Sequence, residues 1–220
     1  MLKFGVAAFL KLASLNPRPR RTELSKRIFP TGTSEPYDFH RRLKLATSKH
    51  IVGGADLLAL IEEAKTIEPV PERKAMVAGL EKLGIWLSDE TASGYKPDSR
   101  IFESPRSLFK VSFQPEFGLQ NGSRRIAFHV WNTQKPELRM GAIYSTLALM
   151  ADVYAELDAC PDDFGLVSLR EPKAYRLSDA AASRYAAADT MVEWIEELIL
   201  DIRSGAGLGS GDHDRPPPWP

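Results

Sequence analysis

The sequence has few of the residues and runs that define specialised classes of protein. Cys160 is the single cysteine among 220 residues, so an intramolecular disulfide is excluded and the chain is compatible with a reducing compartment. No uninterrupted apolar run reaches the roughly 18 residues that are needed to cross a bilayer. With 43% apolar and 26% charged residues, the composition is ordinary for a soluble fold. We therefore expect a soluble, cytoplasmic protein with no membrane partner.

Diagnostic motifs of catalysis and cofactor binding are also missing from the sequence. No histidine or cysteine pair stands at metal-ligand spacing, and no serine nucleophile elbow of the Gly-x-Ser-x-Gly type occurs. The glycine series Gly205, Gly207, Gly209 and Gly211 follows a predicted helix, whereas a dinucleotide-binding fingerprint follows a strand. The sequence therefore predicts no metal and no cofactor.

A β-hairpin over residues 108–132 is the clearest structural prediction. Two alternating apolar runs flank Asn121-Gly122, a pair typical of a two-residue type I′ turn because both positions need positive φ. Counting outward from this turn places Phe113 opposite Val130 and Phe117 opposite Ile126. Pro115 has no N–H to donate and so indicates an edge strand or a bulge. Because side chains alternate, one face is predicted to hold Phe109, Val111, Phe113, Phe117, Ile126, Phe128 and Val130, and the other Lys110, Ser112, Gln114, Glu116, Arg125, Ala127, His129 and Trp131.

The rest of the pattern alternates helices with a second, shorter hairpin. Apolar residues at helical spacing predict helices over 38–52, 57–64, 71–87, 137–157 and 178–205, with Asp38 and Ser178 as caps of the first and last. Residues 166–177 are predicted to form a hairpin around Glu171-Pro172-Lys173, with Val167, Leu169, Tyr175 and Leu177 on one face. Antiparallel hairpins packed against several helices indicate an α+β fold. The order hairpin, helix, hairpin, helix also suggests a two-fold repeat.

Three segments are expected along the chain. Residues 1–36 form a basic N-terminal arm or connector, in which residues 1–15 are an amphipathic stretch whose use as a targeting segment stays open. Residues 16–36 are expected to be a loop or an extended arm. Residues 37–204 form a single α+β domain, and the Gly- and Pro-rich residues 205–220 form a disordered tail.

The charges cancel overall but are unevenly distributed. Residues 1–50 hold 11 Lys and Arg against three acids, and residues 151–220 hold six against 14, so these segments carry +8 and −8. One interpretation is that the two ends attract each other across the fold. The alternative is nucleic-acid binding by the basic region. This alternative assigns binding to Arg18, Arg20, Arg21, Arg27, Arg41 and Arg42, with Lys110, Gln114, Arg125 and a stacking Trp131 added by the polar face of the hairpin.

His129 is the strongest candidate for chemistry. Imidazole titrates near neutrality, and Glu116 lies diagonally across the predicted hairpin, where its carboxylate can orient the ring. Ser112 and Asn132 are candidate accessory groups, and Arg139 is a candidate contact for an oxyanion or phosphate. The competing interpretation is that helices cover His129 and Trp131, which then serve only as packing residues.

Three functions are compatible with the sequence, in descending order. The first is a non-enzymatic protein that interacts with other macromolecules, with a protein partner that the sequence does not identify. The second is a nucleic-acid-associated accessory protein that uses the basic N-terminal region. The third is a small hydrolase-like enzyme centred on His129 and Glu116. The oligomeric state is not defined by the sequence.

Overall fold

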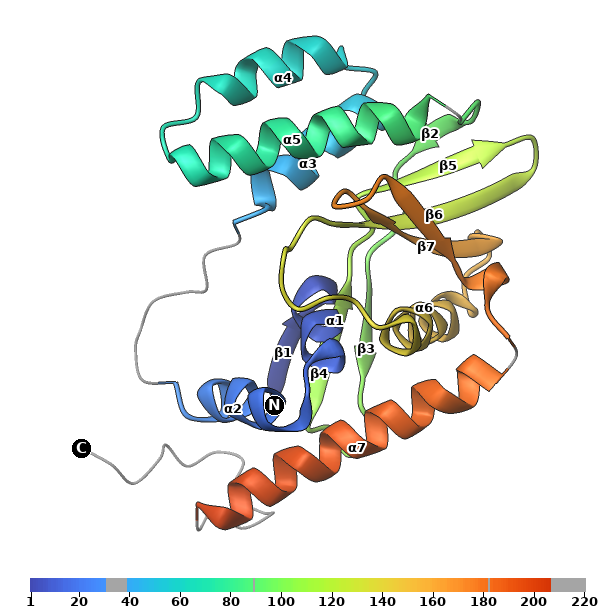
Figure 1. Cartoon of the computed structure of the whole chain (residues 1–220). Coiled ribbons are helices and arrows are strands. Elements are labelled where there is room, and N and C mark those ends of the chain that lie inside the picture. The colour runs from blue at the N-terminus through green and yellow to red at the C-terminus, as the bar shows by residue number, and fades with distance from the viewer. Residues whose placement is uncertain (31–38, 89, 182, 207–220) are drawn as a thin grey trace.

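The structure, a computed structural model, describes residues 1–30, 39–88, 90–181 and 183–206. The predicted α+β fold is confirmed, since these residues hold seven α-helices and two mixed sheets (Figure 1). The helices are α1 (Val6–Ser14), α2 (Pro17–Ile28), α3 (Arg41–Ile51), α4 (Leu57–Lys65), α5 (Val70–Leu87), α6 (Met140–Tyr154) and α7 (Ser183–Gly205). The strands are β1 (Leu2–Gly5), β2 (Ser93–Tyr95), β3 (Arg100–Glu103), β4 (Phe109–Phe113), β5 (Phe117–Asn121), β6 (Arg124–Trp131), β7 (Asp163–Ser168) and β8 (Lys173–Arg176).

The two sheets are built from different parts of the chain. The first sheet has the order β1-β4-β3, with β1 parallel to β4. The second has the order β2-β5-β6-β7-β8, and its parallel pair is β6 and β7. That pair is parallel because α6 carries the chain back between the two strands. Helices α3, α4 and α5 lie on one side of the second sheet, and α6 and α7 lie on the other (Figure 1). No helix in the described ranges is long and apolar enough to cross a membrane.

The hairpin predicted over residues 108–132 is present only in its half nearest the turn. The predicted first strand is divided between the sheets, with β4 in the first and β5 in the second. The division falls at Gln114–Glu116, where Pro115 cannot donate to a ladder. The predicted register is also wrong, because Phe117 pairs with Phe128 and the turn is Gly122–Ser123, with Gly122 at a φ of 60°. A shift of two residues leaves each side chain on its predicted face.

The division of the strand overturns the prediction of a single apolar face. Phe109, Val111 and Phe113 lie in a first core with α1, α6 and α7, together with Ala127 and Trp131 from the face predicted to be polar. Phe117, Ile126, Phe128 and Val130 lie in a second core beneath α3, α4 and α5. Phe113 and Val130 therefore pack in different cores, which lie on opposite sides of the second sheet.

The second hairpin is confirmed as the antiparallel pair β7 and β8, but its predicted face is wrong. Val167 pairs with Ala174, and Leu166 pairs with Tyr175. The register differs from the prediction by an odd number of residues, which moves a strand's side chains to the other face. As a result Val167 and Leu169 pack in the second core, whereas Tyr175 and Leu177 pack against the first.

Helix positions follow the sequence closely from residue 39 onward. The ends of helices α3 to α6 lie within three residues of the predicted ends, and α7 ends at Gly205 as predicted. Its predicted start is wrong, because Leu177–Asp179 form a 3-10 turn in which the Ser178 hydroxyl donates to Asp163 rather than capping a helix. The predicted cap Asp38 and the tail residues 207–220 lie outside the described residues.

The prediction of a loop or extended arm after residue 16 is wrong for residues 17–28. They form α2, which Pro17 begins in a position where a missing N–H costs nothing. Leu24 of this helix is fully buried. The preceding residues form β1 and α1, and the ring centroids of Phe9 and Phe109 lie 5.8 Å apart in the first core. Residues 2–28 are therefore packed against the rest of the molecule.

Candidate basic cleft

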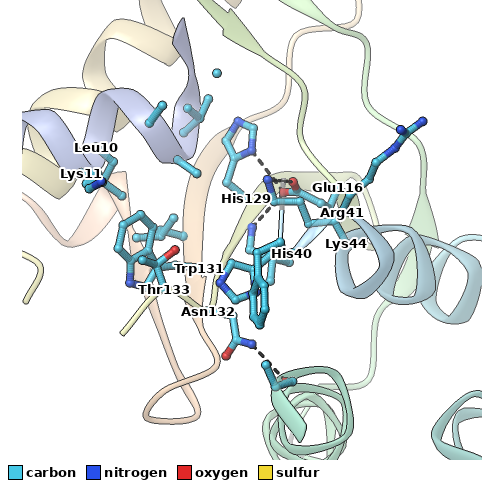
Figure 2. A pocket seen from close by; sticks show the side chains of 18 of the residues that line it. Leu10, Lys11, His40, Arg41, Lys44, Glu116, His129, Trp131, Asn132 and Thr133 are labelled. Atoms are coloured by element: carbon cyan, nitrogen blue, oxygen red, sulfur yellow. Dashed lines mark hydrogen bonds and ion pairs between the residues drawn. The ribbon is translucent and has the colours of Figure 1, made fainter. Parts of the chain in front are cut away.

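A cleft with a volume of about 1700 Å³ lies between the N-terminal elements and α3 and α5. Leu10 and Lys11 of α1 lie on one side, and Arg41 and Lys44 of α3 lie on the other (Figure 2). The end of β6 and the residues that follow it, from His129 to Lys135, line the space between them. The cleft thus joins segments that are more than 100 residues apart in the sequence.

The side chains around this cleft carry a strong excess of positive charge. Among the described lining residues, ten are Lys or Arg and only Glu116 is acidic. The N-terminal elements and the first part of the helical layer supply Lys3, Lys11, Arg27, Arg41, Lys44 and Lys74. Later segments supply Lys82, Lys96, Lys135 and Arg170. Like charges gathered in one cleft repel each other and focus a positive potential into it.

Some of these cations are neutralised by the protein and others are not. Lys11 and Arg27 both approach Glu23, at 3.7 and 3.4 Å. A second group consists of exposed side chains whose charged ends meet no carboxylate anywhere in the described chain: Lys3, Arg41, Lys74, Lys135 and Arg170. These five charges are available to an anionic ligand.

Glu116, the one carboxylate among the described lining residues, is held by three groups at the floor of the cleft. Its Oε2 accepts a hydrogen bond from the Val130 N–H at 2.8 Å and lies 3.2 Å from Nδ1 of His129. Its Oε1 lies 3.9 Å from the Lys44 ammonium. The backbone N–H of Glu116 donates to the Phe128 carbonyl just before β5 begins, which turns the side chain toward β6. The predicted proximity of Glu116 and His129 is therefore confirmed.

The electrostatic state of the pair follows from these contacts. Burial opposes ionisation of Glu116, but His129, Lys44 and the Val130 N–H together hold the pKa of this carboxyl below its ordinary value. An ionised carboxylate only accepts hydrogen bonds, so Nδ1 of His129 carries a proton. The neutral ring then presents Nε2 as an acceptor, and the protonated ring presents it as a donor.

Two buried nitrogens at the cleft have no hydrogen-bond partner among the described residues. They are Nε2 of His129 and Nε1 of Trp131, whose residues are 4% and 2% exposed. Buried polar atoms of this kind are uncommon in folded proteins. Trp131 packs in the first core, so its predicted use as an exposed stacking residue is wrong. His129 and Trp131 are both buried, as the packing interpretation expected, and Trp131 shares the first core with residues of α1 and α6.

The structure brings together six of the residues that the sequence suggested for a site. His129, Glu116, Gln114, Trp131, Arg27 and Arg41 all line the cleft, and so do the suggested accessory residues Ser112 and Asn132. The amide of Asn132 donates to the Ala75 carbonyl at 3.2 Å and so ties the cleft floor to α5. Arg139 lies elsewhere and donates to Asn16, which removes the basis for its suggested anion contact.

The other suggested basic residues are engaged away from the cleft. Arg42 lies 3.5 Å from the buried Glu72, and Lys110 lies 2.8 Å from Glu103. Arg125 packs over the Tyr95 ring at 4.3 Å and donates to the Ala159 carbonyl at 3.2 Å.

Two arginines of α2, Arg20 and Arg21, contact α1 and α7 instead. Arg20 donates to the carbonyls of Leu12 and Ala13 at 3.1 and 2.9 Å and lies 3.8 Å over the Trp194 ring. Arg21 pairs with Asp201. Arg18 is exposed on the outer surface of α2. Among the described residues, the interpretation that the basic and acidic ends attract each other is thus realised at the ion pair of Arg21 with Asp201.

Sequence reasoning missed several of the cleft's cations. Lys3, Lys74, Lys82, Lys96, Lys135 and Arg170 come from separate elements and stand in no motif. Each of them reads in the sequence as an ordinary surface residue. No group of three or more His, Cys, Asp or Glu residues that could hold a metal ion occurs in the part of the chain that the structure describes.

Fold and site together define an α+β protein with a basic cleft between two helical layers. No protein-family model and no curated protein matches the chain. The chain is similar to a solved structure titled "Crystal structure of SSO0001", at 9% identity and a TM-score of 0.34, over 81% of this chain and 82% of the other. A likeness at this TM-score carries no argument about function.

Proposed function

We propose that this protein interacts with nucleic acid and binds it in the basic cleft. The observation that carries the proposal is the ratio of ten Lys and Arg to one acid among the described residues of the cleft. Phosphates neutralised by Lys and Arg release their condensed counterions, and this release drives binding. The second function suggested by the sequence is therefore favoured, with the cleft in place of an N-terminal arm.

The size and the lining of the cleft favour a segment of a polymer over a small metabolite. Pockets for small molecules usually have volumes of about 300–1,000 Å³, and this cleft reaches about 1700 Å³. Phe39 is only partly buried at the cleft, and its ring centroid lies 5.0 Å from that of His40 in an edge-to-face arrangement. An accessible aromatic face beside unpaired cations suits the stacked bases and the backbone of a single strand.

Fluorescence anisotropy with a labelled single-stranded oligonucleotide tests the proposal. A triple variant, Arg41→Ala, Lys74→Ala and Lys135→Ala, removes three exposed cations of the cleft. The matched control, Lys49→Ala, Lys65→Ala and Lys173→Ala, removes three exposed cations that lie outside it. We expect the cleft variant to bind at least about tenfold more weakly at low salt, because three phosphate contacts are lost, and the control to bind like the wild type. Equal affinities of the two variants would overturn the proposal.

A second candidate function is hydrolysis centred on His129. The observation that favours it is the contact between Glu116 and Nδ1, at 3.2 Å, which orients the ring as a carboxylate orients a general base. It ranks second because His129 is 4% exposed and its Nε2 is buried. Incubation of labelled RNA and DNA with the wild type and with His129→Gln tests it, and cleavage that persists in the variant would exclude this role.

A further inference from the structure

The helices that line the cleft differ in how far the protein neutralises their charge. On the side of α1 and α2, Lys11 and Arg27 both approach Glu23. On the opposite side, Arg41 of α3 and Lys74 of α5 are exposed and meet no carboxylate in the described ranges. Arg41 lies across the cleft from Lys11 (Figure 2). Among these four helices, α3 and α5 therefore carry the cations that remain available to phosphates.

The wall formed by α3 and α5 also exposes apolar side chains. Leu45 is 54% exposed, although α3 buries Leu43 in the second core two residues earlier. Leu45 follows Arg41 by one helical turn, so both side chains lie on the face of α3 that lines the cleft. On α5, the exposed Ala78 follows Lys74 by the same interval and also lines the cleft. Apolar and cationic groups are thus neighbours on both helices.

Two more residues extend this apolar surface. Phe39, just before α3, is half-buried and lines the cleft, and its ring meets that of His40 in an edge-to-face arrangement. Pro71, at the start of α5, is exposed and lines the cleft as well. We call Phe39, Leu45, Pro71 and Ala78 the apolar strip. A single exposed apolar residue needs no explanation, but several that line one cleft beside polar groups mark an interaction site.

An unpaired nucleotide carries both kinds of group that this wall can bind. Its base presents an apolar π face, and its phosphate carries a negative charge. In a duplex the bases are stacked inside, so the surface that meets a protein consists of phosphates, sugars and base edges. An apolar strip beside available cations therefore fits an unpaired strand better than a duplex.

We infer that the wall formed by α3 and α5 binds the bases of an unpaired strand. Leu45 and Phe39 contact the bases, and Arg41 and Lys74 contact the phosphates beside them. The apolar contacts then select single strands over duplexes, whereas the charge contributes to the binding of both. The inference rests on the proposed function, since it assigns the part of the nucleic acid that occupies the same cleft.

Two exposed leucines provide a matched pair of variants for fluorescence anisotropy. Leu45→Ala shortens a side chain inside the cleft, and Leu58→Ala shortens one on α4 that is 71% exposed and lies outside it. Neither leucine belongs to a core, so both variants are expected to fold. We expect single-strand affinity to fall about fivefold in Leu45→Ala and at least about tenfold in Phe39→Ala, because base contacts are lost. Leu58→Ala should stay within about twofold of the wild type. If Leu45→Ala and Leu58→Ala bind equally well, the inference is wrong.

A strand without bases separates the inference from the proposed function. An abasic oligonucleotide of the same length keeps every phosphate and lacks every base. We expect the wild type to bind it at least about tenfold more weakly than the normal strand, and Leu45→Ala to bind it like the wild type. Equal, salt-dependent binding of the abasic and the normal strand would refute the base contacts and leave the proposed function intact. No binding of either strand would refute both.

Two unlabelled competitors complete the test. We expect a duplex of the same sequence to displace the labelled strand at least about tenfold less effectively, at equal phosphate concentration, than the single strand does. A peptide rich in glutamate and leucine offers acidic and apolar groups without bases, and we expect no displacement by it at the same concentration. Displacement by this peptide as effective as that by the single strand would assign the wall to an acidic protein segment and overturn the inference.

Discussion

The basic residues of α2 and those of the cleft look alike in the sequence but differ in what they contact. Arg20 is fixed by two backbone carbonyls and the Trp194 ring, and Arg21 by Asp201. In the cleft, Arg41, Lys74 and Lys135 are exposed and meet no carboxylate in the described ranges. The first group holds α2 against α1 and α7, whereas the second is available to a ligand. A cluster of basic residues therefore indicates a ligand site only where other groups of the protein do not already bind the charged side chains.

The largest effect on stability within the cleft is expected at Glu116, the single carboxylate among its described lining residues. Glu116→Ala would leave His129, Lys44 and the Val130 N–H without their shared acceptor. Loss of one partner from a buried charged network typically costs about 3 kcal/mol. We expect the free energy of unfolding, measured with urea, to fall by about this amount. A loss below about 0.5 kcal/mol would show that the pair is more exposed than these contacts imply.

The same carboxylate makes a pH-dependent contribution. Its pKa in the folded protein lies below the ordinary value of 4.5, so its stabilising effect is fully present above that value and is lost as the pH falls through the folded pKa. We expect the difference in unfolding free energy between the wild type and Glu116→Gln to be constant near neutrality and to shrink below about pH 4. A difference that grows on acidification would contradict the assignment.

A smaller loss of stability is expected in α2 from Arg20→Ala. The substitution removes two hydrogen bonds to carbonyls at the end of α1 and the contact with Trp194. Such interactions together are worth about 2 kcal/mol. We expect lower thermal stability and an unchanged oligonucleotide affinity. Weaker oligonucleotide binding with unchanged stability would contradict the comparison, because it would show that Arg20 binds the ligand and does not hold α2 in place.

A gain of stability is expected from a cap at the start of α1. Gly5→Ser supplies a side-chain acceptor for the first-turn N–H groups, in backbone geometry that already suits a cap. Because glycine is itself a tolerable capping residue, the gain should be only about 0.5 kcal/mol. We expect a slightly higher melting temperature in thermal unfolding. A melting temperature that does not rise would show that the first-turn N–H groups already have partners in the wild type.

The features that the sequence predicted are local ones. The turn near Asn121, the spacing of apolar residues in α5 and α6, and the contact of Glu116 with His129 all depend on residues close together in the chain. The division of the predicted strand between two sheets at Pro115 could not be predicted. It depends on the pairing of β4 with β1 and β3, and the hairpin pattern carries no information about these strands.

The cleft escaped prediction for the same physical reason. Its cations come from β1, the helices α1, α2, α3 and α5, and the segments that follow β2, β6 and β7, and only the tertiary fold gathers them. One local signal was present, since Gly5 separates the alternating Leu2 and Phe4 from the helical spacing of Val6, Phe9 and Leu10. That change of period marks the boundary between β1 and α1.

The salt dependence of oligonucleotide affinity tests the central claim most directly. Three proteins are compared: the wild type, the cleft variant lacking Arg41, Lys74 and Lys135, and a variant of α2 lacking Arg18, Arg21 and Lys26. Each phosphate contact on a single strand contributes about 0.7 to the slope of log affinity against log salt concentration. We predict that the cleft variant loses about 2 from the magnitude of this slope and that the α2 variant keeps the wild-type slope. A reduced slope in the α2 variant, with a wild-type slope in the cleft variant, would contradict the account.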